Sequence, residues 1–422
     1  MSGKEILIIG AGLAGVATAW QLHQRGHTVT VMDARDQAAM ETSFANAGAL
    51  TPSQPEPWNA PGVHMELAKS LLGQHSAMKL NWLALPGLIG WGLRFLAHSG
   101  RKPYTAATQA NFALSRYSID ETRKARDTLG LAFDNLRNGT LKLCRDTASL
   151  EATIRAAATL GEQDLSYEVL DRDGLITAEP QLAPIADQLV GAVRFPDDES
   201  GDAHAFTQAL AREAEAAGVR FEWNTRIDAL MDRAGKIVGV YTAEEEIEVD
   251  TIVLAGGHAA WRLLAPHGLH LPVRPVKGYS LTLDMSGLND RPHIPVVDES
   301  LHTMITPMGD RLRVAGTAEI TGENTDLTPA RIENLKHLLG ELYPELAERL
   351  LTADIQPWAG LRPVSADGRP FIGETRAPGL WLNVGHGHLG WTQAMGSGAL
   401  LADLITGNET VIDPSPYAAN RF

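Results

Sequence analysis

The sequence contains very little cysteine and no cluster of basic residues. Cys144 is the only cysteine among 422 residues, which excludes an intrachain disulfide and any metal site built from several cysteines, and favours a reducing compartment. The 36 Lys and Arg residues are outnumbered by 51 Asp and Glu, giving a formal net charge of −15. Because binding to nucleic-acid phosphates needs clustered positive charge, a nucleic-acid partner is not expected.

The sequence also lacks an apolar run of the roughly 18 residues that a membrane-spanning helix requires. Residues 80–97 come closest, but Asn81, Pro86, Arg94 and three glycines interrupt them. Two interpretations stay open for this segment: a buried hairpin of helices, or an interfacial segment whose aromatic side chains beside Arg94 contact a membrane. The expected location is the cytoplasm, either free or at the inner face of the membrane.

The length of the chain indicates two domains, because 422 residues exceed what one hydrophobic core usually fills. Hydrophobic residues make up 44% of the chain and 40 residues are glycine. This composition is typical of a globular protein in which glycines serve tight turns and close backbone approaches.

A glycine-rich turn near the N-terminus lies between a strand expected from Glu5 to Gly10 and a helix expected from Leu13 to Arg25. In the sequence GAGLAG the first glycine allows the turn, the second lets a pyrophosphate approach, and the third permits close packing of the helix. The helix N-terminus then favours the phosphate charge. The predicted contacts in this turn are Gly10, Ala11, Gly12, Ala14 and Gly15.

An acidic residue follows the second expected strand, Thr28 to Met32. Asp33 lies 18 residues after Gly15, where a carboxylate can accept hydrogen bonds from a ribose, and Ala34 is its neighbour. Strand, glycine turn, helix, strand and acid together predict an adenine dinucleotide site. The motif does not separate FAD from NAD, and Arg35 beside Asp33 leaves NADP open.

The middle of the chain contains a second glycine turn. An amphipathic helix is expected from Phe206 to Ala217, and an apolar strand from Asp250 to Ala255 ends at Gly256-Gly257. A returning segment of this kind belongs to the FAD-binding version of the fold and favours FAD; the alternative is an ordinary turn between a strand and a helix. Strands of a meander are expected at Val219 to Asn224, Lys236 to Thr242 and Glu246 to Val249.

A third glycine-rich turn precedes the last helix. A strand from Trp381 to Val384 leads into GHGHLG, and an apolar helix is expected from Trp391 to Thr406. The free N–H groups at the start of this helix suit an anion such as a reduced flavin. An ordinary capped helix is the alternative.

Together these segments resemble a known family, the FAD-dependent D-amino-acid oxidase superfamily, and within it the bacterial D-amino-acid dehydrogenase (small subunit) branch. The similarity covers nearly the whole chain. IIGAGLAGVATAWQL is generic to dinucleotide enzymes, whereas the other three stretches are specific in order and spacing. These are ETSFANAGALTPSQPEPWNAPGV from Glu41, PVKGYSLTL from Pro275, and WAGLRPVSADGRPFIG through GHGHLGWTQAMGSG from Trp358.

The resemblance implies an α/β (α+β) fold in which a Rossmann-like FAD-binding domain holds an inserted substrate domain built on a mixed or antiparallel sheet. The FAD-binding domain is expected to be discontinuous, with residues 1–54, 195–274 and 355–422. Residues 55–194 and 275–354 are expected to form the substrate domain.

The resemblance also assigns residues to the flavin. The loop around Ser43 is expected to line the phosphates and the ring, Ile227 to meet adenine through its backbone, and Gly256 to lie beside the ribityl chain. The remaining expected flavin contacts are Asn46, Ala47, Gly48, Ala49, Gly387, Leu389, Gly390 and Thr392. Cys144 does not resemble the cysteine that tethers flavin in related enzymes, so noncovalent FAD is expected.

Three residues are predicted to act on the substrate. Arg362 resembles the arginine that binds the substrate carboxylate, a role that suits a planar guanidinium; a surface ion pair is the alternative. Tyr279 is expected either to roof the substrate pocket or to pack against the sheet. His386, with His388, is expected at the flavin edge. No metal is expected, because zinc needs three or four ligands.

The implied reaction is oxidation of a D-amino acid by hydride transfer to flavin N5, giving a 2-oxo acid and ammonia after hydrolysis. The implied partners are a small amino acid and an electron acceptor such as quinone, with membrane contact through residues 80–97 as an open alternative. Two rival functions stay open. One is a related oxidation of D-hydroxyproline, glycine, sarcosine or an opine, and the other is a noncatalytic flavin-binding subunit of a larger dehydrogenase.

Overall fold

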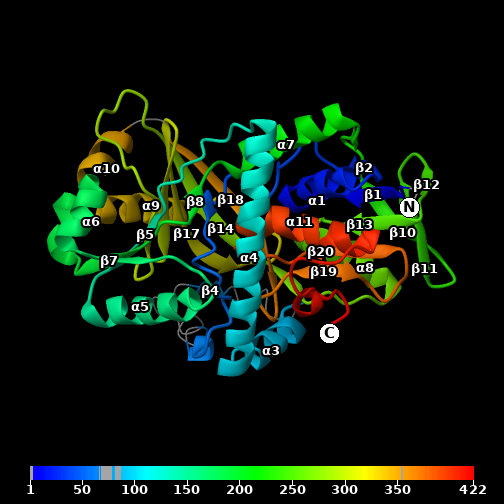
Figure 1. Cartoon of the computed structure of the whole chain (residues 1–422), viewed down its shortest axis with the longest axis horizontal. Helices are drawn as coiled ribbons and strands as arrows, with labels where there is room; N and C mark the ends of the chain where they lie inside the picture. Colours follow the sequence, from blue (N-terminus) through cyan, green and yellow to red (C-terminus); the bar gives the residue numbers. More distant parts are fainter. Residues whose placement is uncertain (1–2, 66, 68–77, 81–86, 353–354) are drawn as a thin grey trace.

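The computed structural model describes residues 3–65, 67, 78–80, 87–352 and 355–422. It has two lobes, each built around a large sheet, with the long helix α4 (Arg101–Leu129) running between them (Figure 1). The N-terminus and the C-terminus both belong to the lobe that contains the first strand and the last long helix.

The first lobe contains a six-stranded sheet in the order β19-β20-β13-β1-β2-β9, parallel except for the antiparallel edge strand β19. The strands are β1 (Glu5–Ile9), β2 (Thr28–Met32), β9 (Arg220–Glu222), β13 (Thr251–Leu254), β19 (Phe371–Glu374) and β20 (Leu380–Val384). All four residues of β13 are buried, as is usual for a parallel strand covered on both faces. The expected first strand, helix and second strand are confirmed.

Three helices pack with this sheet around one hydrophobic core, to which α4 also contributes Leu114 and Ile119. The helices are α1 (Leu13–Gln24), α7 (Ala203–Ala217) and α11 (Gly390–Thr406). Helix α7 begins three residues before its expected start, because the side chain of Asp202 caps it by accepting hydrogen bonds from the His204 and Ala205 N–H groups.

The meander differs from the prediction. Its three antiparallel strands are β10 (Ile227–Arg233), β11 (Lys236–Thr242) and β12 (Glu246–Glu248), whereas the expected first strand is β9, which pairs with β2 in the main sheet. Strand β10 was not predicted. Its pairing with β11 has two register shifts, and such irregularities hide the two-residue alternation that marks a strand in sequence.

The second lobe contains a nine-stranded mixed sheet in the order β18-β14-β17-β16-β15-β5-β7-β6, with β4 beside β17. The strands are β4 (Met78–Leu80), β5 (Thr140–Cys144), β6 (Glu168–Asp171), β7 (Gly191–Phe195), β14 (Val273–Asp284), β15 (Val296–Asp298), β16 (Thr303–Met308), β17 (Arg311–Ile320) and β18 (Ile355–Ser365). A pair of short strands, β3 (Ala49–Leu50) and β8 (Glu199–Ser200), lies apart from both large sheets. The predicted combination of a Rossmann-like unit and a mixed sheet is confirmed.

Helices cover one face of this sheet and leave part of the other to face the first lobe. Residues of α9 (Pro329–Leu342) and α10 (Pro344–Leu350) form a second core with β14, β16 and β17. Further helices within the described ranges are α3 (Ile89–Ala97), α5 (Thr147–Gly161), α6 (Arg172–Ala178) and α8 (Ala260–Leu264).

Two elements cross the predicted domain boundaries. The range 355–422 was assigned to the cofactor domain, yet β18 pairs along its whole length with β14 in the second sheet. Residues 55–194 were assigned to the substrate domain, yet α4 packs against α11. A Cβ at Gly396 would lie 2.7 Å from the Cα of Ser118, so these two helices approach very closely.

Residues 80–97 are described only in part, because residues 81–86 lie outside the described ranges. Helix α3 buries Trp91 and Phe95 and exposes Ile89, Leu93 and Leu96. In the described part of the chain, no helix combines the length and the apolar character needed to cross a bilayer.

Candidate active site

The N-terminal glycine turn has the shape that a dinucleotide phosphate requires. Gly10 has φ +106°, and a Cβ at Gly15 would lie 1.8 Å from the Gly10 carbonyl oxygen, so both positions demand glycine. At Gly12 the nearest atom to an added Cβ is the Ser43 Oγ at 3.8 Å. The backbone at Gly12 is therefore open to a ligand, and no side chain caps the helix that follows it.

The Asp33 carboxylate lies against this turn. It accepts hydrogen bonds from the N–H of Ala11 at 2.6 Å and of Arg35 at 2.8 Å, with Ala34 exposed beside it. The Arg35 guanidinium donates to Glu41 at 2.7 Å. Glu41 thus neutralises the positive charge that would otherwise suit the additional phosphate of NADP.

The second glycine turn lies beside the first. A Cβ at Gly10 would lie 3.3 Å from the Gly256 Cα, because β13 and β1 are neighbours in the sheet. Ile227 begins β10 just after Thr225, whose N–H donates to the Asp33 carbonyl at 2.8 Å. Asp33, Gly256 and Ile227 thus border one region beside the first turn.

The loop after Ser43 is held by side chains of the other lobe. The carbonyl oxygens of residues 45, 46 and 47 accept hydrogen bonds from Ser280 Oγ, Arg313 Nη1 and Thr306 Oγ1, each at 2.7 Å. Gly48 has φ +75° and lies against Thr306. No sequence pattern predicts these three donors, because each is one polar residue within an ordinary strand.

The start of α11 lies close to the same loop. Its N-cap residue, Leu389, offers no capping side chain, so the first N–H groups of the helix, beginning at Gly390, lack helical acceptors. The Thr392 side chain is committed elsewhere, since its Oγ1 accepts from the Thr51 N–H at 3.1 Å and donates to the Ala49 carbonyl at 3.4 Å. At Thr392 only the backbone is left for a ligand.

The turn before α11 is attached directly to β18. Gly387, with φ +59°, donates its N–H to the Pro363 carbonyl at 2.9 Å, and Val364 forms a backbone bridge with His386. These contacts place the start of α11 next to the residue that precedes Pro363 on β18, which is Arg362.

Arg362 carries a charge that the described residues leave unpaired. Its Nη1 donates to the Thr317 carbonyl at 3.3 Å, and its guanidinium carbon lies 5.5 Å from the centre of the Trp58 ring. No Asp or Glu of the described ranges forms an ion pair with it, and burial lowers its pKa to about 10. Any side chain at Gly278 would displace the guanidinium, because a Cβ there would lie 2.0 Å from Nη1.

The two histidines of the turn are held neutral. Burial lowers the pKa of His386 to about 4, and its buried Nε2 has no hydrogen-bond partner among the described residues. The His388 ring stacks on Trp58 at 5.2 Å. The surrounding protein and, secondly, the Arg362 charge lower the pKa of His388 to about 3. In the described ranges no group of three metal-binding side chains is formed.

Tyr279 is not brought together with Arg362. It lies on the opposite face of β14, where its hydroxyl contacts Glu319 at 2.8 Å and Thr328 at 2.9 Å. It is 1% exposed and belongs to the core under α9. This placement corresponds to the alternative in which Tyr279 packs against the sheet. Tyr279 does not roof the substrate pocket, because neighbouring residues of a strand point to opposite faces of the sheet.

Besides the three donors to the loop, two further contributors to the site could not be predicted from the sequence. Trp58 lies within the quoted stretch from Glu41, but nothing in the sequence places its ring between Arg362 and His388. Thr317 has φ +63°, an unusual conformation for a β-branched residue, and this conformation is observable only in the fold. Arg362, which has no acidic partner in the described ranges, thus lies beside the loop after Ser43 and the uncapped start of α11.

Comparisons with known proteins identify the family of the chain. Residues 5–404 match the family described as FAD dependent oxidoreductase. The chain is 41% identical over 418 residues to a D-amino acid dehydrogenase of Bradyrhizobium diazoefficiens, covering 99% of each protein.

Solved structures share the fold at lower sequence identity. An L-proline dehydrogenase from P. horikoshii superposes with a TM-score of 0.79 at 18% identity, covering 100% of this chain and 98% of that one. A glycine oxidase from Geobacillus kaustophilus gives 0.76 at 22% identity, with 100% of both chains covered. With the family match spanning nearly its full length, the chain belongs to the FAD-dependent oxidoreductase family.

Proposed function

We propose that this protein oxidises a D-amino acid to the 2-oxo acid and ammonia, with Arg362 binding the substrate carboxylate. The relatives named D-amino acid dehydrogenase support the substrate class, since they match 99% of this chain at about 40% identity. The observation that carries the proposal is the unpaired Arg362 guanidinium, placed between the flavin loop and the start of α11.

The proposed cofactor contacts are those predicted from the sequence, which the fold gathers around the glycine turns, the loop after Ser43 and the start of α11. When bound there, FAD would supply a two-electron acceptor for the hydride on the substrate Cα. The only cysteine, Cys144, is buried in β5 of the other lobe, where burial also raises the pKa of its thiol. We therefore propose a noncovalent, dissociable FAD.

Arg362 is proposed to orient the substrate. Two parallel charge-assisted hydrogen bonds to the carboxylate would fix its plane and hold Cα in one position. Thr42 Oγ1 donates to the Leu361 carbonyl at 2.7 Å, which ties the flavin loop to the residue next to Arg362. The distance between the carboxylate site and the flavin loop is thus set by a direct hydrogen bond.

The start of α11 and the neutral histidines are proposed to complete the site. The partial positive charge of an uncapped helix N-terminus favours negative charge that develops near it. Because His386 and His388 are uncharged above about pH 4, they add no positive charge that would repel a substrate amine. The unpartnered Nε2 of His386 is proposed as a hydrogen-bonding group at the flavin edge.

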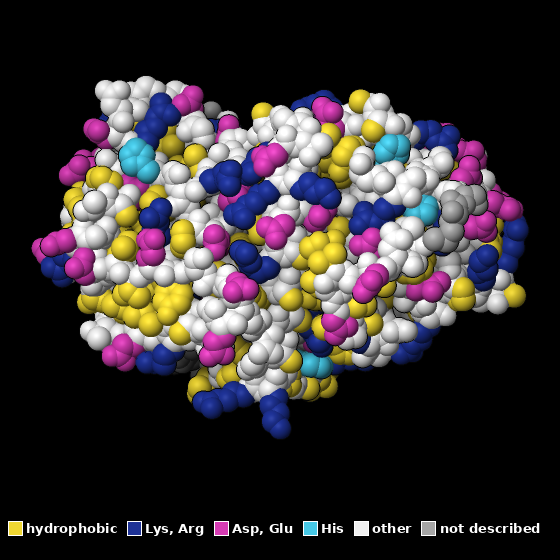
Figure 2. Space-filling view, viewed as in Figure 1, with side chains coloured by type: hydrophobic (Ala, Val, Ile, Leu, Met, Phe, Trp, Pro, Cys, Tyr) yellow, Lys and Arg dark blue, Asp and Glu magenta, His cyan; other side chains and the backbone are white. Residues whose placement is uncertain are grey.

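We further propose that the electrons pass to a quinone at a membrane surface. Helix α3 exposes Ile89, Leu93 and Leu96, and Arg101 and Lys102 are exposed where α4 starts. Figure 2 shows apolar and basic side chains together at the lower edge of the molecule, where Figure 1 places these two segments. This combination suits an interface with anionic lipid.

Anaerobic flavin reduction tests the proposed function. The FAD-loaded protein is mixed with matched D- and L-amino acids in the absence of oxygen, and the flavin absorbance is followed. We expect D-amino acids, and not their L-enantiomers, to bleach the flavin. Bleaching by glycine, sarcosine or an opine alone would assign a related amine oxidation, and no bleaching by any amine would indicate a noncatalytic flavin-binding subunit.

A further inference from the structure

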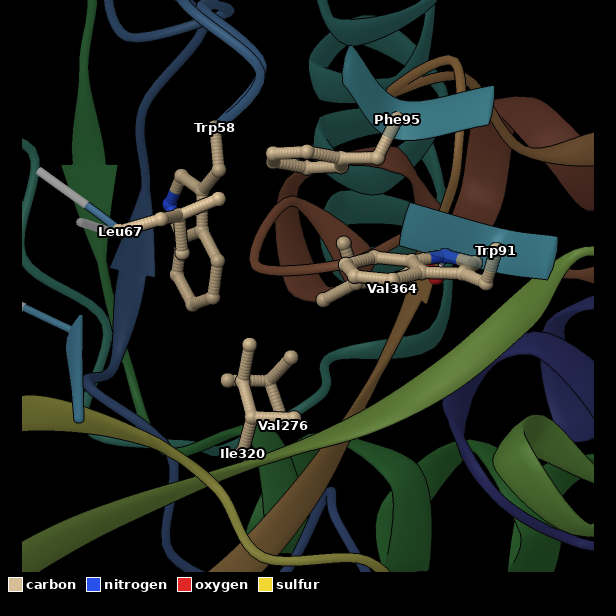
Figure 3. Close-up of a pocket in the computed structure, with 7 residues that line it drawn as sticks. All are labelled: Trp58, Leu67, Trp91, Phe95, Val276, Ile320 and Val364. Atoms are coloured by element: carbon tan, nitrogen blue, oxygen red, sulfur yellow. Dashed lines mark hydrogen bonds between the residues drawn. The ribbon is translucent and has the colours of Figure 1, made fainter. Parts of the chain in front are cut away.

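An apolar pocket shares the Trp58 ring with Arg362. Figure 3 shows three aromatic rings, Trp58, Trp91 and Phe95, facing a common space, with the side chains of Val276 and Ile320 closing it from below (Figure 3). Leu67 and Val364 complete the lining. Counted out to its opening, the space is about 260 Å³, and its enclosed part has room for about one water molecule.

The pocket and the arginine share their supports. Val276 is the register partner of Arg362 in the pairing of β14 with β18, and Val364 lies two residues further along β18 and therefore on the same face. The Trp58 ring borders both, since it lies 5.5 Å from the Arg362 guanidinium carbon. A carboxylate bound to Arg362 would place the next atoms of its molecule at the mouth of the pocket.

The described residues that line the pocket carry no charge. Every lining side chain is apolar or aromatic, and the Trp91 Nε1 is already used, because it donates to the Val364 carbonyl at 3.1 Å. A charged or amide group moved into this space would lose its hydration without gaining a partner. An apolar group would gain contact with the rings and displace little water.

We infer that this pocket receives the side chain of the substrate and selects amino acids whose side chains are apolar and uncharged. The inference rests on the proposed function, since it takes the carboxylate to be bound by Arg362. Ile320, which is 3% exposed and lies on the pocket floor, sets the length of side chain that fits without movement of the rings.

The test compares substrate selectivity in FAD-loaded wild-type protein and two matched variants. Ile320→Ala enlarges the pocket, whereas Ile305→Ala removes the same atoms from the core on the opposite face of the sheet. The measured quantity is the ratio of kcat/KM for D-phenylalanine to that for D-alanine. We expect Ile320→Ala to raise this ratio about tenfold and Ile305→Ala to leave it within about twofold of wild type.

A second measurement needs no variant. D-leucine and D-asparagine have side chains of nearly equal size, so their comparison isolates polarity. We expect the wild-type protein to use D-leucine with a kcat/KM about tenfold or more above that for D-asparagine. Equal use of the two, or efficient use of D-lysine or D-aspartate, would overturn the inference even if Ile320→Ala failed to fold.

The remaining outcomes are separable. A change in the KM for a quinone acceptor in Ile320→Ala, with an unchanged ratio of the two amino acids, would assign the pocket to the acceptor and contradict the inference. Failure of every D-amino acid to reduce the bound flavin would remove the proposed function itself, and the side-chain pocket with it. Flavin reduction without selectivity would remove only the pocket.

Discussion

The Arg362 guanidinium has a pKa lowered to about 10 by burial, no acidic partner within the described ranges, and a hydrogen bond to the Thr317 carbonyl oxygen. Buried charges are ordinarily paired. An unpaired buried charge destabilises the free protein. A bound carboxylate would pair with this charge and remove the destabilisation. Substitution of Arg362 therefore tests the proposed site directly.

Arg362→Met is expected to lower kcat/KM for D-amino acids about a hundredfold or more, because the charge-assisted bonds to the carboxylate are lost. Arg362→Lys should recover part of this loss through charge alone. The decarboxylated amine of the same substrate should be insensitive to either change. Steady-state kinetics with both compounds makes the comparison, and Arg155→Met, at an exposed surface arginine, serves as the control. A uniform loss for acid and amine would contradict the assigned role.

Asp198 predicts a pH dependence of stability. Burial raises its pKa from 3.8 to about 7, although Ser53 and Thr140 donate hydrogen bonds to it. The folded protein therefore holds this proton up to about pH 7, whereas the unfolded chain releases it near pH 4. The stabilising contribution is fully present below about pH 4 and is lost as the pH rises to about 7.

Denaturant unfolding of FAD-loaded wild type and Asp198→Asn at pH 5 and pH 8 measures this effect. Wild type should lose stability relative to the variant between the two pH values. Asp187→Asn, at a fully exposed carboxylate, should track wild type at both. A free-energy difference between wild type and Asp198→Asn that did not change with pH would show that Asp198 does not titrate in this range.

At the scale of elements, strand β16 presents two threonines to opposite faces of the sheet. Thr306 donates to the Ala47 carbonyl in the flavin loop, and Thr303 donates to the Ala315 carbonyl within the sheet. Thr306→Val should weaken FAD binding about fivefold, because one hydrogen bond of about 1 kcal/mol then no longer holds the loop. Thr303→Val should leave the FAD dissociation constant unchanged. Titration of the apoprotein with FAD measures both, and an equal effect would show that the loop does not depend on β16.

The predictable elements are those whose signal is local. The first glycine turn, α1 and β2 follow from residues adjacent in sequence, and a side chain at Gly10 or Gly15 would meet nearby backbone atoms. Strand β10 was not predicted because its bulges interrupt the alternation of apolar and polar residues that marks a strand. The face of Tyr279 depends on the register of β14 against β17, which shifts between Lys277 and Tyr279, and no local pattern reports such a shift.

The site was predictable to the same extent. Arg362, the loop after Ser43 and the start of α11 could be named from their motifs. Their partners Ser280, Arg313 and Thr306 could not, because they come from three strands whose polar residues look unremarkable until tertiary pairing brings them to one loop.

At the scale of the whole molecule, helix α3 sets an expectation for location. Leu93 is 66% exposed, and Arg101 and Lys102 are exposed at the start of α4, the next helix along the chain. Leu93→Glu should reduce binding to vesicles containing anionic lipid. The substitution removes apolar area that would be buried in the bilayer and adds a negative charge that the anionic headgroups repel. Sedimentation with vesicles measures this. Val411→Glu, at another exposed apolar residue, is the control, and equal sedimentation of all three proteins would remove α3 from the proposed interface.

The path of β18 has a consequence for motion. This strand is paired with β14 in one lobe, and its end is bridged to the turn that opens α11 in the other. The guanidinium and the helix terminus are therefore spaced by one short continuous piece of backbone. Hinge opening between the lobes would loosen the hydrogen bonds that cross to the loop after Ser43 first. Hinge motion between the lobes therefore leaves the spacing of Arg362 and the start of α11 unchanged. The same motion weakens the hold on the loop after Ser43 and so favours loss of the cofactor.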